Sequence, residues 1–342
     1  MNHSDGAAAP QAEIDQAARI LESGGLVAFP TETVYGLGAD AENPAAVARI
    51  YQAKGRPNDH PVIVHVAPGA DLDYWVTDIP EQARQLVAAF WPGPLTLILK
   101  RASHIPDAVS GGQDTVGLRC PSHPVAIALL RAFKGGKGGL AAPSANKFGQ
   151  VSPTTAQHVR DEFGAEPLLA AVLDGGPSEV GIESTIVDLS RLASHGPVLL
   201  RPGHISAQQI ADVIGQQPGL PDHSAPRASG TLESHYAPYT PVAMLAPDAL
   251  PATLARLEGL GRKVALVACS VAAGAGPCVR LPAEPVGYAY GLYAALRQLD
   301  LSGADLILVE APPQELRWLG VNDRLRRAAF GSSGIVERFL RA

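Results

Sequence analysis

The sequence predicts an α/β protein with two domains joined by a linker. Short apolar runs typical of buried strands alternate with longer amphipathic segments along most of the chain. With 342 residues, 46% of them hydrophobic, the chain can bury two cores. Between residues 215 and 241 the composition shifts to Pro, Gly, Ser, His and Gln without periodicity, as in linkers. We therefore expect a large first domain over 1–208, a linker over 209–241 and a smaller α/β domain over 242–342.

The elements of the first domain follow from periodicity and capping. Asn43-Pro44, for example, is an N-cap followed by a first-turn proline, so a helix should begin there and end near Lys54. Further helices are expected over 11–22, 79–90, 125–133, 154–163 and 205–214. Strands are expected over 26–29, 61–66, 95–99, 115–119, 140–142, 170–173, 184–189 and 198–201.

The second domain repeats the alternation on a smaller scale. Strands are expected over 242–245, 263–268 and 305–310, with helices over 250–257, 287–299 and 322–330. No internal repeat relates the two parts.

Charge and composition limit the function. The net charge is −6, and the acidic excess lies entirely before Ser206, so the first domain is a poor duplex binder. No apolar run reaches the ~18 residues of a membrane helix, and residues 1–10 lack a signal-peptide pattern, so we expect a soluble cytoplasmic protein. Cys120, Cys269 and Cys278 lack paired spacing, so we expect reduced thiols without a zinc site.

The stretch Phe29–Asp40 presents a group of polar side chains. Thr31, Glu32, Thr33 and Tyr35 follow a buried strand that Pro30 closes, so we expect them on a loop at its carboxyl end. Open α/β sheets bind ligands at that edge. A polar turn between a strand and a helix is the simpler alternative.

Several charged residues occupy positions where a ligand could meet them. Lys54 and Arg56 flank a glycine at a helix exit and could converge on one anion, although dipole pairing at the helix terminus also explains them. Arg119 ends a buried strand and must therefore meet a carboxylate or phosphate, from protein or ligand. His65 lies among aliphatic residues, where a core histidine is the usual interpretation.

Short polar residues follow later strands. Pro143-Ser-Ala-Asn146 and Ser152-Pro-Thr154 suit phosphate or ribose oxygens, with helix capping as the alternative. Ser184 opens one strand and Arg201 closes another. The glycine-rich loop 134–139 lacks the Walker pattern. In the linker, His235 and Tyr236 are adjacent aromatics that suggest a lid over the first domain, unless Tyr236 only anchors the linker to the second domain.

Taken together, these motifs resemble the YrdC-like threonylcarbamoyl-AMP synthase family in its longer, two-domain type. The matched stretches cover almost the whole chain: 30–37, 54–57, 91–96, 116–119 with Pro121 and 123–124, 143–146, 152–154, 181–188, 201–203 and 235–238. The chain departs from the family's pattern at His60, Phe148 and Glu233, which puts the shape of the adenine pocket and the charge of the lid in question.

The resemblance implies a twisted, open, mixed α/β sheet in the N-terminal domain and a Rossmann-like C-terminal domain. It also implies synthesis of threonylcarbamoyl-AMP and pyrophosphate from L-threonine, bicarbonate or CO2 and ATP. The product would pass to the tRNA threonylcarbamoyl transferase machinery for modification of adenosine 37, with weak or indirect tRNA contact. Mg²⁺ would arrive with ATP, without a dedicated protein metal site.

The resemblance also assigns residues. Threonine would be held by Thr33, His65, Arg119, Ala142 and Ser184, with Arg119 on the carboxylate. Lys54 and Arg56 would be catalytic. ATP would be held by Arg56, His60, Thr115, Ser144, Asn146, Ser152, Arg201 and Tyr236.

Two other functions stay open at this point. A double-stranded RNA-binding module is the first, although the acidic first domain disfavours it. Another carbamoyl or nucleotidyl transferase on the same fold is the second, although the larger relatives of that kind carry zinc-finger cysteines that this sequence lacks.

Overall fold

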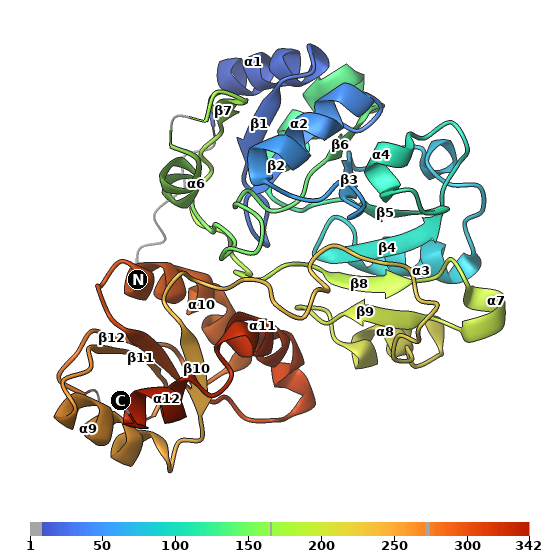
Figure 1. The fold of residues 1–342 in the computed structure, drawn as a ribbon. Helices are drawn as coiled ribbons and strands as arrows, with labels where there is room; N and C mark the ends of the chain where they lie inside the picture. The colour runs from blue at the N-terminus through green and yellow to red at the C-terminus, as the bar shows by residue number, and fades with distance from the viewer. Residues whose placement is uncertain (1–8, 165, 271–273, 342) are drawn as a thin grey trace, which may run out of the picture. The chain divides into compact units, whose positions relative to one another are not determined.

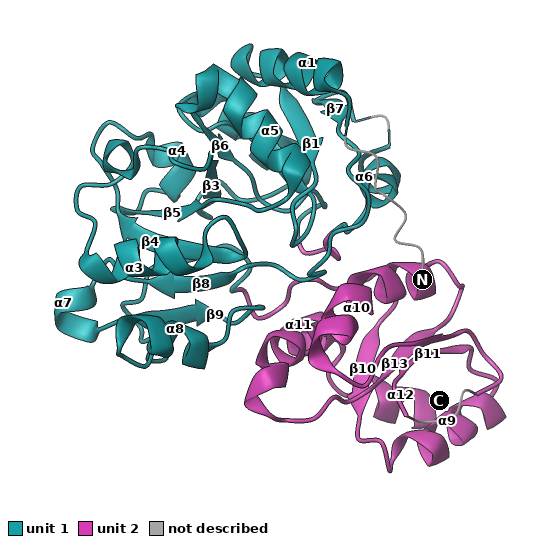
Figure 2. Cartoon of the chain, turned by 180° about the vertical axis from the view of Figure 1, so that it is seen from behind, with its two compact units in different colours: residues 1–148, 153–231 teal, residues 149–152, 232–342 magenta. Residues whose placement is uncertain are grey.

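The computed structural model describes residues 9–164, 166–270 and 274–341 and divides the chain into two compact units (Figure 2). Unit 1 comprises residues 1–148 and 153–231, and unit 2 comprises residues 149–152 and 232–342. The predicted linker is therefore shared between the units, with its first part, up to Thr231, in unit 1.

Unit 1 is built on one mixed nine-stranded sheet in the order β7-β1-β2-β6-β3-β5-β4-β8-β9 (Figure 1). The sheet contains parallel pairs, such as β3 with β5, and antiparallel pairs, such as β4 with β5. The strands are β1 (Leu26–Phe29), β2 (Gly36–Asp40), β3 (Ile63–Val66), β4 (Leu95–Lys100), β5 (Thr115–Arg119), β6 (Gly139–Ala141), β7 (Leu169–Val172), β8 (Thr185–Asp188) and β9 (Val198–Arg201). The predicted open mixed sheet is confirmed.

Capping residues define both ends of helix α2. The side chain of Asn43 accepts hydrogen bonds from the N–H groups of Ala45 and Ala46 at the start of α2, and Gly55 ends that helix in the left-handed region at φ 63°. The helices are α1 (Gln11–Glu22), α2 (Pro44–Lys54), α3 (Glu81–Phe90), α4 (Asp107–Ser110), α5 (Pro124–Ala132), α6 (Ala156–Phe163), α7 (Leu192–His195) and α8 (Ala207–Ile214).

The two faces of this sheet are covered differently. One face carries the main core, to which α2 contributes Val47 and Ile50 and α3 contributes Leu86. On the other face, α1 and α5 pack over β1 and β6 and bury residues such as Phe29 and Leu140. On this second face, α1 and α5 therefore cover the part of the sheet formed by β1 and β6. They leave the part formed by the other strands uncovered.

Unit 2 has a parallel four-stranded sheet in the order β10-β13-β11-β12. Its strands are β10 (Val242–Leu245), β11 (Val264–Ala268), β12 (Cys278–Arg280) and β13 (Leu306–Glu310), and its helices are α9 (Leu250–Gly259), α10 (Pro285–Asp300), α11 (Leu319–Ala329) and α12 (Ile335–Arg341). Parallel strands connected by helices give the expected Rossmann-like α/β arrangement.

The stretch 29–40 differs from its prediction as a loop, because Gly36–Asp40 forms β2, antiparallel to β1. The sequence does not indicate this strand, because glycine is depleted in strands. Gly38 is needed here because a Cβ at this position would lie 2.8 Å from the Phe29 ring. Strand β12 and helices α4, α7 and α12 were also not predicted. Within the described residues, every helix is too short or too polar to cross a bilayer.

Candidate active site

Strands β3 and β5 place three predicted site residues on one face of the sheet. His65 lies opposite Arg119 in the register of the pair. Val64 and Leu118 belong to the main core on the opposite face. Because successive side chains of a strand alternate, His65, Thr115 and Arg119 all project from the face that the main core leaves free.

Arg119 is paired with the carboxylate of Glu32. The distance from Arg119 Nη2 to Glu32 Oε1 is 2.7 Å, and both residues are at least 95% buried. The other carboxylate oxygen accepts a hydrogen bond from the Ser122 N–H at 3.1 Å. Arg119 Nε donates to the Gly93 carbonyl at 3.4 Å. The expectation that Arg119 must meet an acid is therefore confirmed, and the acid comes from the β1–β2 loop.

The contact between Glu32 and Arg119 is an ion pair and not an aligned hydrogen bond. Within the described part of the chain, Arg119 Nη2 and Glu32 Oε1 have no partner of good hydrogen-bond geometry. A guanidinium can fork a second carboxylate while it keeps the first, because it has five N–H donors. Arg119 thus keeps capacity for an anionic group of a ligand.

His65 is a neutral imidazole beside that guanidinium. Burial, and then the positive charge of Arg119, lower the pKa of His65 to about 3. Its ring meets the ring of Phe29 edge to face, with centroids 6.1 Å apart. His65 can therefore contact a ligand by hydrogen bonding but carries no charge at neutral pH.

The β1–β2 loop is held by its own hydroxyl groups. The side-chain oxygens of Thr31 and Thr33 lie 2.9 Å apart, and the Thr31 hydroxyl donates to the Val34 carbonyl at 2.6 Å. Ala142 lies next to this region, because a Cβ on Gly36 would be 3.4 Å from the Ala142 side chain. The Ala142 N–H donates to the Ile63 carbonyl at 2.9 Å, so its remaining backbone group is the carbonyl.

Lys54 reaches the loop that follows β6. Its Nζ donates to the Ser144 carbonyl at 2.7 Å and to the Asn146 carbonyl. Burial, and next the charge of Arg56, lower the pKa of Lys54 well below its usual value. The lysine thus braces the backbone that carries Ser144 and Asn146.

Arg56 and His60 follow helix α2, and Arg56 is close enough for its charge to act on His60. Arg56 Nη2 donates to the Pro61 carbonyl at 2.7 Å. Burial and the Arg56 charge lower the pKa of His60. The centroid of the His60 ring lies 5.6 Å from that of the Phe148 ring, so two of the three departures from the family's pattern contact each other.

Ser184 and Arg201 form a third polar group at the far end of the sheet. The Ser184 hydroxyl lies 2.8 Å from the Thr96 hydroxyl and accepts from Arg201 Nη2 at 3.1 Å. Arg201 Nε donates to the Ser184 carbonyl at 3.0 Å, and Nη1 donates to the Ser229 carbonyl at 2.7 Å.

The first part of the linker covers the sheet beside this group. Ala228 is buried in an apolar cluster with residues of β3, β4, β8 and β9, and Ala225 packs against that cluster. The space left between Arg227–Ser229 and the strands is only about 10 Å³ and is lined on the sheet side by Ile63 and Thr115. The linker therefore lies directly on the face that bears Thr115.

Ser152 and Tyr236 belong to unit 2. The Tyr236 ring lies 5.7 Å from the Tyr293 ring, and the Arg324 guanidinium lies over it at 5.5 Å. The N–H of Ala237 donates at 3.0 Å to the carbonyl of Gly149, three residues before Ser152 in the chain. Tyr236 thus packs against an aromatic ring and a guanidinium of unit 2.

The structure therefore connects most predicted residues of unit 1 in three groups. These are Glu32, Arg119 and His65; Lys54, Arg56, His60, Ser144 and Asn146; and Ser184 and Arg201. Glu32 and Thr96 are polar partners that the sequence prediction did not assign. The rule that Arg119 needs an acid could have found Glu32, whereas Thr96 carries no comparable signal. Groups of three or more His, Cys, Asp or Glu suited to a metal ion are absent from the described residues.

Comparisons with known proteins identify the family. A family model described as "Telomere recombination" (Sua5/YciO/YrdC) matches residues 19–203, and one described as "Threonylcarbamoyl-AMP synthase, C-terminal domain" matches residues 205–330. This chain belongs to the threonylcarbamoyl-AMP synthase family. The family includes the threonylcarbamoyl-AMP synthase of Bacillus subtilis, which is 41% identical over 334 residues, 93% of either chain.

Archaeal members of the family are similar over the same length. The threonylcarbamoyl-AMP synthase of Pyrococcus abyssi is 39% identical over 92% of this chain and 93% of that protein. The crystal structure of P. abyssi Sua5 complexed with L-threonine matches with a TM-score of 0.85 and 38% identity, over 94% of this chain and 95% of the other. The match over both domains assigns this chain to the two-domain type.

Proposed function

We propose that this protein condenses L-threonine, bicarbonate or CO2 and ATP to threonylcarbamoyl-AMP and pyrophosphate. The observation that carries the proposal is the match over more than nine-tenths of the chain to enzymes of that name. The buried Arg119 on the ligand-facing side of the sheet supports it, because an amino-acid substrate brings a carboxylate that needs such a partner.

Threonine would bind around Arg119. Its carboxylate would take the guanidinium N–H groups that Glu32 leaves available, while Thr33 and Ser184 offer hydroxyl groups of the size needed for its short polar side chain. The neutral ring of His65 and the carbonyl of Ala142 would complete the contacts. Buried polar groups of this kind favour an amino acid that satisfies them over one that leaves them unpaired.

ATP would bind along the cationic residues of the sheet face. Arg56 and Arg201 would neutralise phosphate charge. Lys54 would hold the loop that carries Ser144 and Asn146, so that these two residues can contact ATP. His60 and Thr115 are further candidates for ATP contacts on this unit.

The reaction needs no protein nucleophile. The amine of threonine and CO2 form a carbamate, whose oxygen attacks the α-phosphorus of ATP while the bond to the β-phosphate oxygen breaks and pyrophosphate leaves. The protein would act by alignment and by charge neutralisation, and well-oriented reactants reach effective molarities on the order of 10⁵ M. Lys54 and Arg56 are the residues we place nearest the reacting phosphates.

Magnesium would enter with ATP, because Mg²⁺ keeps several waters and prefers phosphate oxygens to a protein cage. When bound, it would neutralise phosphate charge. The positive charges of Arg56 and Arg201 on this unit suit such a complex, because they would offset the charge of the phosphates. We further propose that the protein works in the cytoplasm and passes its product to the tRNA threonylcarbamoyl transferase machinery, with weak or indirect tRNA contact.

The linker would act as a lid. In unit 1 the Ser229 carbonyl accepts a hydrogen bond from Arg201, and Ala228 is buried in the apolar cluster beside Thr115. A phosphate that takes Arg201 must replace that carbonyl, so ATP binding would shift this part of the linker. A lid would also protect the labile adenylate from water.

A panel of amino acids tests the proposed function. The purified chain is given ATP, Mg²⁺ and bicarbonate with each amino acid in turn, and pyrophosphate release is measured. We expect release with threonine and far less with other amino acids. Release that does not depend on the amino acid would contradict the proposal.

A further inference from the structure

Thr96 lies on the ligand-facing side of the sheet, between two residues assigned to threonine. Its neighbours in β4 belong to the main core on the opposite face, so the Thr96 side chain projects from the face that bears Arg119. Leu97 pairs with Leu118 of β5, and this register places Thr96 opposite Arg119. On the other side, the Thr96 hydroxyl lies 2.8 Å from the hydroxyl of Ser184, which directly precedes β8.

The direction of the Thr96 hydroxyl is fixed by its packing. A Cβ at Gly117 of β5 would lie 3.5 Å from the Thr96 methyl carbon, so the methyl group faces β5 while the hydroxyl faces Ser184. Thr96 is 0% exposed, and a β-branched side chain has little rotational freedom at χ1. Thr96 therefore offers the Ser184 hydroxyl a partner in one fixed position.

The two hydroxyl groups carry one hydrogen more than they can use between them. Among the described residues, the partners of the Ser184 hydroxyl are Thr96 and Arg201, and the partner of the Thr96 hydroxyl is Ser184. Arg201 Nη2 donates to Ser184 at 3.1 Å and accepts nothing. The bond between the hydroxyl groups uses one hydrogen, whichever group donates it, so the other hydrogen remains. Buried donors usually have an acceptor, which here indicates a ligand atom.

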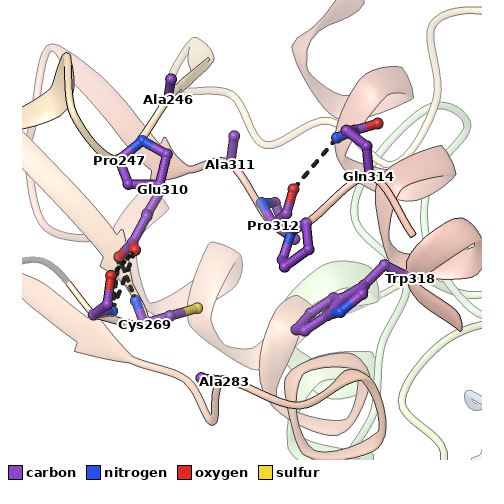
Figure 3. A pocket seen from close by; sticks show the side chains of 11 residues that line it. Ala246, Pro247, Cys269, Ala283, Glu310, Ala311, Pro312, Gln314 and Trp318 are labelled. Carbon is purple, nitrogen blue, oxygen red and sulfur yellow. Dashed lines mark hydrogen bonds between the residues drawn. The ribbon is translucent and has the colours of Figure 1, made fainter.

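A buried polar group of unit 2 shows the opposite balance. Glu310, beside a cavity of about 450 Å³, accepts hydrogen bonds from the backbone N–H groups of Cys269 at 2.7 Å and Ser270 at 3.0 Å, and from the Ser270 hydroxyl (Figure 3). Groups of the protein itself satisfy this carboxylate. The pair of Thr96 and Ser184 instead keeps a hydrogen for which the described part of unit 1 supplies no acceptor.

We propose that Thr96 is a positioning residue that holds the Ser184 hydroxyl towards the hydroxyl group of the threonine substrate. This inference rests on the proposed function. Because Arg119 would take the substrate carboxylate, the substrate hydroxyl oxygen is the acceptor left for the remaining hydrogen. Thr96 would thereby help the site to prefer threonine over an amino acid of similar shape without a hydroxyl group, since that amino acid would leave the buried hydrogen unpaired.

The substrate reaches Ser184 when the linker shifts. Ser184 is 0% exposed in this structure, and Arg201 joins it to the linker, since Nη2 donates to the Ser184 hydroxyl and Nη1 donates to the Ser229 carbonyl. The linker shift proposed above would open the site from that side. The bond to Thr96 lies between adjacent strands of the sheet, so it would hold Ser184 in place during this movement.

Thr96→Val tests the proposal, because valine keeps the branched shape and removes the hydroxyl group. Pyrophosphate release from the full-length protein gives the KM for L-threonine, and competition gives the inhibition constant of L-2-aminobutyrate, which lacks the hydroxyl. The ratio of that inhibition constant to the KM should fall at least about fivefold, as for one lost hydrogen bond, with a smaller change in kcat. Thr96→Ser keeps the hydroxyl and should restore most of the ratio.

Thr185→Val is the matched control. Thr185 is also 0% exposed, and its hydroxyl donates to the Ile205 carbonyl at 2.7 Å, away from Ser184. The same substitution there removes a buried hydrogen bond of similar kind, so it should lower stability and leave the ratio unchanged. A loss of discrimination in Thr96→Val alone therefore comes from its place beside Ser184 and not from a weakened fold.

A double-mutant cycle shows whether Thr96 acts through Ser184. Thr96→Val combined with Ser184→Ala should discriminate no worse than Ser184→Ala alone. An unchanged ratio in Thr96→Val, an equal loss in Thr185→Val, or additive losses in the double variant would each overturn the proposal. If the unaltered protein released no pyrophosphate with threonine, the proposed function would fail and this inference with it, a result distinct from the other three.

Discussion

Glu32 Oε1 lies 2.7 Å from Arg119 Nη2, and both side chains are only 5% exposed. A buried charge without a partner is strongly unfavourable, so this pair fixes the direction of the guanidinium. It links the β1–β2 loop to the end of β5, which are distant in sequence. The proposed threonine site therefore depends on Glu32 as well as on the residues that would touch threonine.

Glu32→Gln should raise the KM for threonine about tenfold, equivalent to about 1.4 kcal/mol, with a smaller change in kcat. The amide keeps the shape of the side chain but no longer holds the guanidinium by charge. Steady-state kinetics with varied threonine measure this effect. The matched control is Asp107→Asn, which breaks a surface pair with Arg101 in which the acid is 77% exposed, and which should leave the KM unchanged.

Arg119→Ala should weaken threonine binding by about 2 to 3 kcal/mol, the usual loss for a charge-assisted pair. ATP binding should change much less. Isothermal titration with each substrate separates the two effects, and Arg119→Lys should rescue little because an ammonium cannot fork a carboxylate. Threonine affinity equal to that of the unaltered protein would remove Arg119 from the site.

His65 should make stability depend on pH. Its pKa is lowered to about 3 in the folded state from 6.5 in the unfolded state, so the unfolded chain binds the extra proton between these values. The stability from the neutral ring is fully present above pH 6.5 and is lost as pH falls from about 6.5 towards 3. Denaturant titrations at several pH values should show that the free energy of unfolding of His65→Gln falls less steeply with decreasing pH over this range. The slopes of the two proteins should differ by up to the equivalent of one bound proton. Parallel pH profiles for the two proteins would contradict the assignment.

Lys54→Met should reduce the free energy of unfolding by about 1 to 3 kcal/mol, because two buried carbonyl groups lose their donor. It should also weaken ATP binding, since those carbonyls belong to the loop that presents Ser144 and Asn146. Urea denaturation and nucleotide titration measure the two effects. Lys137→Met, at an exposed position, is the control and should change neither.

Ala228→Glu should release the first part of the linker from the sheet, because it places a charge in an apolar cluster. Hydrogen exchange over residues 216–231 should accelerate while the strands of unit 1 keep their protection. Leu220→Glu alters the same linker at a position that is 86% exposed and should have no such effect. Equal exchange in both variants would mean that Ala228 does not hold the linker.

Local chemistry made much of the fold predictable. The Asn43 cap, Pro44 and Gly55 define α2 in the sequence as they do in the structure, because these preferences act over neighbouring residues. Strand β2 was not predicted, since its glycines serve the close approach of Gly38 to Phe29, a tertiary contact. The division of the linker at Thr231 was also not predicted, since it depends on packing of Ala228 and Tyr236 on different units.

The candidate site was predictable in part for the same reason. Arg119 could be singled out because a strand-end arginine needs an acid, but the identity of that acid depends on how the β1–β2 loop folds back. The pairing of Ser184 with Thr96 depends on the alignment of β4 with β8, which no local pattern encodes.

Incubation with ¹³C-bicarbonate, L-threonine and ATP tests the central claim most directly. Mass spectrometry should detect threonylcarbamoyl-AMP heavier by the one labelled carbon, formed together with pyrophosphate and only when all three substrates are present. Arg119→Ala should lose this product at threonine concentrations that saturate the unaltered protein. Pyrophosphate release with an adenylate that carries no label from bicarbonate would contradict the account.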